Sequence, residues 1–82
     1  MKRSKQEIIA QILEVCLESV SKTRIVYQVN LNFRTINPYL ETLIKNNLID
    51  VCEGEQKLYK TTHKGADLLK TIKRINISLS KD

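Results

Sequence analysis

The feature that most constrains this chain is a pair of amphipathic segments that follow each other with almost no linker. In residues 23–30 (TRIVYQVN) the apolar side chains recur at helical spacing, and Ser21 just before them is a suitable N-cap. Residues 32–46 form the second segment, with Asn32 as its expected cap and these apolar residues on one side: Phe33, Ile36, Leu40, Leu43 and Ile44. The pattern predicts two helices, the first ending at Asn30, joined by about three residues.

Pro38 lies inside the second of these segments, where a proline removes one backbone hydrogen bond and bends a helix. At about 100° per residue, Pro38 falls almost opposite the apolar side, so we expect it to face away from the core. In the alternative arrangement Asn37 caps a separate helix that begins with Pro38, and residues 32–36 form a turn of their own. The continuous helix is favoured because Phe33 and Ile36 stay in phase with the apolar residues that follow the proline.

Another helix is predicted before this pair. Ser4 and Glu7 have the spacing of a capping box, in which each residue caps the other's backbone N–H. The apolar residues that follow recur at helical spacing: Ile8, Ile9, Ile12, Leu13, Cys16, Leu17 and Val20. We expect this helix over residues 5–19.

Residues 48–62 (LIDVCEGEQKLYKTT) change to an alternating pattern of apolar and polar residues on both sides of EGEQ. This pattern predicts a two-stranded hairpin with Gly54 in its turn. Four residues are expected on its inward face: Ile49, Val51, Tyr59 and Thr61. A lone hairpin is unstable in water, so the helices must cover that face.

A last helix is predicted after Thr62, its expected N-cap. Four apolar residues in it are spaced four, three and four apart, as in a coiled-coil seam: Leu68, Ile72, Ile75 and Leu79. This seam either packs on the chain's own core or pairs with the same helix of a second copy. Because residues 72–82 reach beyond what so small a core can cover, we expect a homodimer.

Charge narrows the class of partner. The 82 residues include 14 Lys+Arg and 9 Asp+Glu, which gives a net charge of +5 and a pI near 9.4. A small basic domain favours a polyanion, usually nucleic acid.

Several function classes are not indicated. Cys16 and Cys52 have no CxxC spacing and there is one histidine, His63, so we expect neither a metal nor a disulfide. With Gly54 and Gly65 as the two glycines, a phosphate-binding loop is excluded, and no nucleophile stands beside a base. We therefore expect no cofactor and no enzyme.

The chain contains no apolar run long enough to span a membrane, and its N-terminus lacks the pattern of a secretory signal. We expect a cytoplasmic protein that contacts no membrane.

The order helix, helix, helix, hairpin, helix resembles the small archaeal winged-helix DNA-binding proteins that dimerise through a C-terminal helix. The resemblance covers roughly residues 4–75 and is most specific in SKTRIVYQ, in YLETLIKNNLI, and in Tyr59 followed by Thr62 and Gly65. It implies an α+β, mostly helical, winged helix-turn-helix fold in a single domain, residues 1–82. Residues 5–62 would form the helix-turn-helix core and wing, and residues 63–82 the dimerisation helix.

The resemblance also implies that residues 32–46 are the recognition helix, residues 53–57 the tip of the wing, and the nucleoid the place of action. The expected DNA contacts are Lys22, Thr23, Arg24, Asn32, Arg34, Thr35, Asn37, Pro38, Tyr39, Thr42, Lys45 and Lys57. Lysine and arginine would neutralise phosphates, and Arg34 and Asn37 are the candidate base readers because their side chains pair bidentately with base edges.

Two features weigh against a strong contact through the wing: Glu53 and Glu55 lie at its tip, where they would repel phosphate. We expect double-stranded DNA as the partner, the helix-turn-helix to bind most of it, and the protein to act as a transcription regulator. The alternatives are a non-specific chromatin protein and a winged helix that binds another protein.

Overall fold

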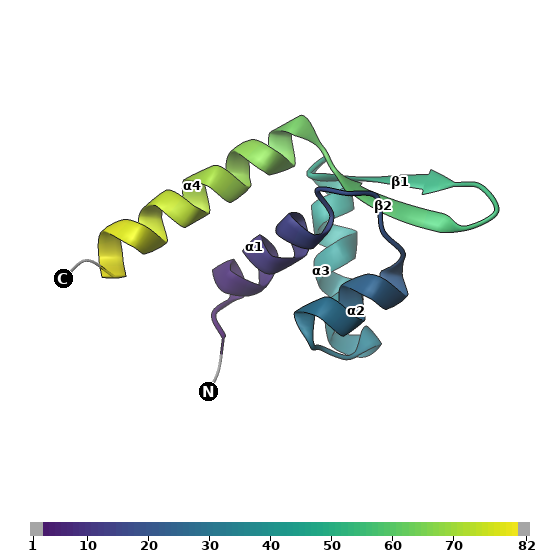
Figure 1. Cartoon of the computed structure of the whole chain (residues 1–82), viewed down its shortest axis with the longest axis horizontal. Coiled ribbons are helices and arrows are strands. Elements are labelled where there is room, and N and C mark those ends of the chain that lie inside the picture. The colour runs from purple at the N-terminus through teal and green to yellow at the C-terminus, as the bar shows by residue number, and fades with distance from the viewer. Residues whose placement is uncertain (1–2, 81–82) are drawn as a thin grey trace.

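The computed structural model describes the backbone of residues 3–80 and the side chains of residues 3–75. Its elements are α1 (Lys5–Val15), α2 (Lys22–Val29), α3 (Phe33–Lys45), β1 (Ile49–Glu53), β2 (Lys57–Thr61) and α4 (His63–Ser80). The first three helices pack together, the hairpin projects from one end, and α4 runs back along α1 (Figure 1). The predicted order and the α+β, mostly helical class are confirmed.

All three predicted N-caps of the first three helices are present. The Glu7 backbone N–H donates to Ser4 Oγ over 3.1 Å and the Ser4 N–H donates to Glu7 Oε1 over 2.9 Å, which completes the capping box. Ser21 Oγ accepts from the Arg24 N–H at 3.2 Å, and Asn32 Oδ1 accepts from the Thr35 N–H at 2.8 Å. These capping hydrogen bonds therefore fix the start of each helix at the residue that the sequence predicts.

α3 is one continuous helix with Pro38 inside it, so the favoured reading is confirmed and the arrangement capped by Asn37 is not adopted. Pro38 is exposed, as expected. Phe33 is an exception to the predicted apolar side, because 47% of its surface is exposed. A helical side chain leans toward the N-terminus, so that of Phe33, the first residue of α3, projects past the end of the helix.

α1 ends at Val15 with Cys16 as its C-cap, four residues earlier than the predicted residue 19. The chain leaves the helix because Val20 pairs with β2: the Tyr59 N–H donates to the Val20 carbonyl over 2.7 Å, and the Val20 N–H donates back over 3.0 Å. Thr61 also caps the end of α1, donating from its N–H to the Cys16 carbonyl (2.8 Å) and from Oγ1 to the Leu13 carbonyl (2.7 Å). These contacts satisfy helix-end carbonyls that a longer helix would have used.

The hairpin has the expected inward face. β1 and β2 are antiparallel, with Ile49 opposite Thr61 and Val51 opposite Tyr59. Ile49, Tyr59 and Thr61 are buried and Val51 is half-buried. The helices thus cover the face that an isolated hairpin would leave in water.

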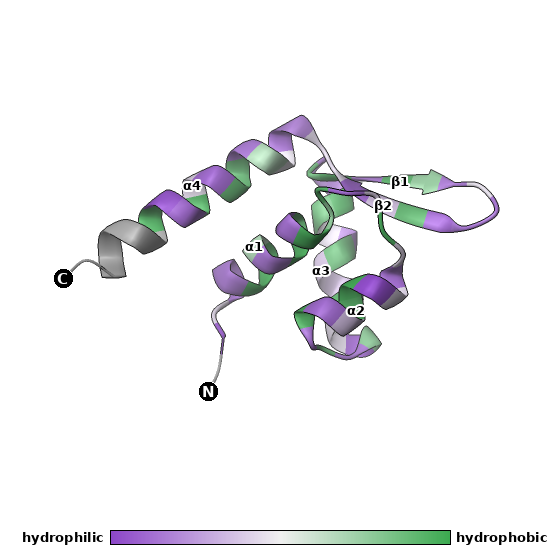
Figure 2. Cartoon of the chain, viewed as in Figure 1, coloured by the Kyte–Doolittle hydropathy of each residue, from purple (hydrophilic) through white to green (hydrophobic). Residues whose placement is uncertain are grey.

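One core joins the helices to the hairpin. It is made of Ile8, Ile12, Leu13, Cys16, Ile25, Val29, Ile36, Leu40, Leu43, Ile49, Tyr59 and Leu69. In Figure 2 hydrophobic residues recur along α1 and α4 between hydrophilic ones, as expected of helices with one covered side. None of the described helices combines the length and hydropathy needed to cross a membrane.

The buried thiol of Cys16 makes the free energy of unfolding depend on pH. The side chain is fully buried, and this desolvation raises the pKa of its thiol from 9.0 to about 12. In the unfolded chain the thiol ionises above its ordinary pKa, whereas in the folded chain it stays neutral, so unfolding releases a proton in this window. The stability that the neutral Cys16 thiol contributes is therefore fully present below about pH 9, and it is lost as the pH rises toward 12.

We expect the free energy of unfolding of the wild type to fall by about 2 kcal/mol more than that of Cys16→Ala between about pH 8 and about pH 10.5. Urea unfolding of both proteins at the two pH values measures this difference. The groups shared by the two proteins cancel in the comparison. Equal pH dependence in wild type and variant would contradict the prediction.

Candidate nucleic-acid interface

The outward side of α3 is a solvent-exposed surface on the second helix of the helix-turn-helix. Side chains three and four residues apart share one side of a helix. Five exposed residues of α3 meet this condition, and we call them the outward face: Arg34, Pro38, Glu41, Thr42 and Lys45. The face is opposite the buried residues Ile36, Leu40 and Leu43, so it presents two cations, a carboxylate and a hydroxyl to solvent.

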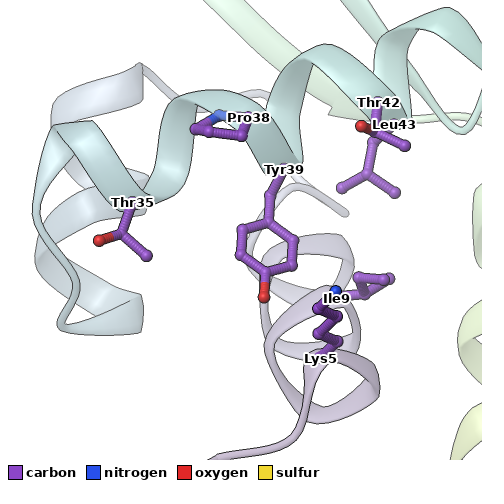
Figure 3. A pocket seen from close by; sticks show the side chains of 7 residues that line it. All are labelled: Lys5, Ile9, Thr35, Pro38, Tyr39, Thr42 and Leu43. Atoms are coloured by element: carbon purple, nitrogen blue, oxygen red, sulfur yellow. The ribbon is translucent and has the colours of Figure 1, made fainter.

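The other predicted residues of α3 lie at its start and on its flanks. Thr35 is exposed, whereas Asn37 is half-buried. Asn32 caps the helix through its side-chain oxygen, and its amide NH₂ is the donor group that a ligand could use. The ring of half-buried Tyr39 extends toward Ile9 of α1 (Figure 3). The outward face therefore contains four of the eight predicted contacts of this segment, Thr35 borders it, and Asn32, Asn37 and Tyr39 are set apart.

The start of α2 contributes three predicted residues with different surroundings. Lys22 is half-buried, while Thr23 and Arg24 are exposed. Arg24 lines a hollow that is also lined by Glu14, at the end of α1, and by Glu18, in the segment that follows α1. Glu14 forms an ion pair with Lys73 Nζ at 3.2 Å, and the negative charges near Arg24 reduce the attraction of this region for phosphate.

The wing remains acidic at its tip. Lys57, the predicted contact, is exposed and lies opposite Glu53 in the register of the hairpin. Exposed Glu55 lies in the turn between the strands. Lys60 does not offset these negative charges at the tip, because its Nζ donates to the Leu17 carbonyl, just after α1, over 2.6 Å. The wing thus has little net attraction for a phosphate backbone.

Sequence reasoning missed two exposed residues. Glu41 belongs to the outward face, and its helical phase, three residues after Pro38 and four before Lys45, is the signal that locates it. Tyr27 on α2 is 83% exposed, four residues after Thr23 and opposite the buried Ile25 and Val29. Both follow from periodicity alone.

The predicted dimer seam on α4 has two parts. Leu68 is half-buried and Ile72 is buried within the chain itself. Ile75 is 44% exposed, and the Leu79 side chain lies outside the residues whose side chains are described. A second copy would therefore have to use Ile75 and the residues after it.

Metal chemistry is not indicated by the described residues. Within residues 3–75, whose side chains are described, no three His, Cys, Asp or Glu side chains gather as a metal site requires.

The chain matches known proteins over nearly its whole length. Residues 2–79 match the sequence model of a winged helix-turn-helix family, which is not an enzyme family. An uncharacterized protein of Methanocaldococcus jannaschii is 36% identical over 70 residues, covering 76% of this chain and 72% of that protein.

Two solved structures share the fold. Sso10a-2, described as a DNA-binding protein from Sulfolobus solfataricus, superposes with a TM-score of 0.81 and 29% sequence identity, covering 96% of this chain and 90% of that one. ZitR of Lactococcus lactis, solved in complex with DNA, has a TM-score of 0.69 and 13% identity, covering 98% of this chain and 60% of that one. At that identity, the likeness to ZitR is one of fold alone.

Proposed function

We propose that this chain, which belongs to the winged helix-turn-helix family, binds double-stranded DNA with α3 in the major groove. The outward face of α3 carries the proposal, because it presents Arg34 and Lys45 at its two ends with Thr42 between them. A major groove admits one α-helix, and these side chains match phosphate oxygens and base edges. The net charge of +5 favours the same partner.

The similarity to Sso10a-2 supports the proposal, since the two chains align over nearly their full lengths and that protein binds DNA. We assign most of the affinity to α3 and the start of α2. The acidic wing tip, with Glu53 and Glu55, contributes little.

A salt series tests DNA binding directly. Fluorescence anisotropy of a labelled random duplex, titrated with the protein at several salt concentrations, should give an affinity that falls linearly in a log-log plot. No binding at low salt would reject the proposal and would favour a protein partner. An affinity that hardly responds to salt would also speak against phosphate contacts.

Within DNA binding, we propose a sequence-preferring transcription regulator that acts on nucleoid DNA, and not a general chromatin protein. The argument rests on Glu41, whose carboxylate lies on the outward face. A carboxylate there repels phosphate, which weakens binding to arbitrary sequence, but it accepts a hydrogen bond from the N4 amine of cytosine. A protein that packs DNA of any sequence would gain no affinity from such a residue.

Glu41→Gln should bind random duplex several-fold more tightly than the wild type and show a salt slope steeper by up to about one, because one repulsive charge is gone. The preference for a selected target over random duplex should shrink. Asp67→Asn on α4 is the matched control, since it changes the net charge equally, away from α3. If both variants raise affinity alike, Glu41 has no local role.

We also propose that the protein is a homodimer through the end of α4. Ile75 carries this proposal, because it is a large apolar side chain of α4 that is left 44% exposed. α4 also continues past α1 (Figure 1). A two-fold dimer would present two copies of α3 and would favour paired half-sites.

Ile75→Asp should convert a particle of twice the 9.5 kDa chain mass into a monomer, as measured by sedimentation equilibrium. Thr71→Asp adds the same charge at an exposed position of α4 outside the seam and should leave the mass unchanged. A monomeric wild type at high micromolar concentration would refute the dimer.

A further inference from the structure

A hollow of about 520 Å³ lies between α1 and α3, beside the outward face (Figure 3). Seven residues line it: Lys5 and Ile9 from α1, and Thr35, Pro38, Tyr39, Thr42 and Leu43 from α3. Its volume is in the range of pockets that hold small molecules, roughly 300–1,000 Å³. The DNA-binding proposal does not use Lys5, the charged residue of this lining.

The lining has an apolar part and a polar part. Ile9 and Pro38 supply hydrocarbon surface above the buried Leu43, and the Tyr39 ring extends across from α3 toward α1. The polar groups are the hydroxyls of Tyr39 and the two threonines, together with the Lys5 ammonium. An apolar surface with a few polar groups is typical of a ligand site.

The charge of the hollow selects the sign of the ligand. Lys5 is the single charged residue among those that line it, and no carboxylate does so. Among the described side chains, the ion pairs are Lys73 with Glu14 and His63 with Asp67, so Lys5 has no acidic partner there. A single ammonium beside apolar surface attracts one negative charge on an otherwise apolar molecule.

We propose that this hollow binds a small amphipathic carboxylate and that the ligand lowers the affinity for DNA. The carboxylate pairs with Lys5 and accepts from the neighbouring hydroxyls, while its aliphatic chain covers Ile9 and Pro38. A fully polar anion would leave the apolar surface exposed to water, and a cation would be repelled by the Lys5 ammonium.

The effect on DNA rests on the proposed function. Pro38 and Thr42 line the hollow and also belong to the outward face of α3, and Thr35 borders both. A ligand in the hollow therefore occupies space beside the DNA surface, and the two compete. For competition, a ligand concentration of ten times its Kd weakens the apparent DNA affinity by about tenfold.

The first experiment uses the full chain without DNA. Octanoate is the probe and octanamide its neutral counterpart, and amide NMR shifts report on Ile9, Thr35, Tyr39 and Thr42. The expected result is saturable shifts at these residues with octanoate, at least fivefold tighter than with octanamide. Lys5→Gln should abolish that difference, whereas Lys70→Gln, at an exposed site on α4, should keep it.

Shifts that do not saturate, that spread equally over other lysines, or that survive Lys5→Gln overturn the site. The second experiment repeats the DNA titration with octanoate at ten times its Kd. A fall of about tenfold supports competition, and an unchanged affinity overturns it. If the protein binds no DNA at all, the proposed function fails, but the NMR titration still decides whether the hollow is a carboxylate site.

Discussion

Gly65→Ala should destabilise the fold by about 3 kcal/mol or more, the largest effect we expect from a single added methyl group. Gly65 is buried in the first turn of α4, next to Leu48 just before β1 and to Thr61 at the end of β2. A Cβ there would collide with the Leu48 carbonyl oxygen and lie 2.8 Å from Thr61 Cγ2. The Leu48 carbonyl is backbone held by the Thr62 N–H at 3.0 Å, so it has little room to move.

The same junction makes the collision hard to relieve. Thr62 Oγ1 accepts from the Gly65 N–H at 3.0 Å and donates to the Asn47 carbonyl over 2.7 Å. Shifting α4 outward would break these hydrogen bonds and open the core at Leu69.

Urea unfolding followed by circular dichroism measures the loss of stability. Gly54→Ala is the matched control, because a Cβ at this exposed turn position meets nothing within 4 Å. Its free energy of unfolding should stay within about 0.5 kcal/mol of the wild type. Similar midpoints for Gly65→Ala and wild type would show that α4 sits farther from β1 than the structure has it.

Arg34→Ala should weaken DNA binding by about 1–3 kcal/mol, or roughly fivefold to 150-fold. Arg34 is exposed in the first turn of α3, so its guanidinium is free to reach phosphate or a guanine edge. Losing a phosphate contact should also make the salt slope shallower by about one.

The two roles of Arg34 separate in one experiment. Anisotropy titrations of a selected target and of random duplex should lose affinity equally if Arg34 holds a phosphate, and the target should lose more if it reads a base. Lys70→Ala on α4 is the control for net charge. Wild-type affinity in Arg34→Ala would remove α3 from the interface.

Much of the secondary structure could be predicted because its causes are local. The caps at Ser4, Ser21 and Asn32, and the hairpin register that sets Val51 opposite Tyr59, all follow from residues a few positions apart. The continuous α3 follows from the phase of its apolar residues, which outweighs Pro38.

The candidate site was only partly predictable. Helical phase locates Arg34, Pro38, Thr42 and Lys45 on one face, and it locates Glu41 there as well once the phase is followed through. Helical phase says nothing of the surroundings of Arg24, which include Glu14 of α1 and Glu18 just after it. Which helix lies beside a given flank is decided by packing between elements.

The sequence by itself determined where the helices begin, that a hairpin follows them, and which side of α3 meets solvent. These properties depend on backbone propensity and side-chain periodicity within single elements. Only the tertiary structure decided that α1 stops at Val15, that Ile72 is buried within the chain, and that Lys5 lines a hollow with Tyr39. Each of these depends on contacts between elements distant in sequence, such as the bond from Thr61 to Leu13 across 48 positions, which periodicity does not encode.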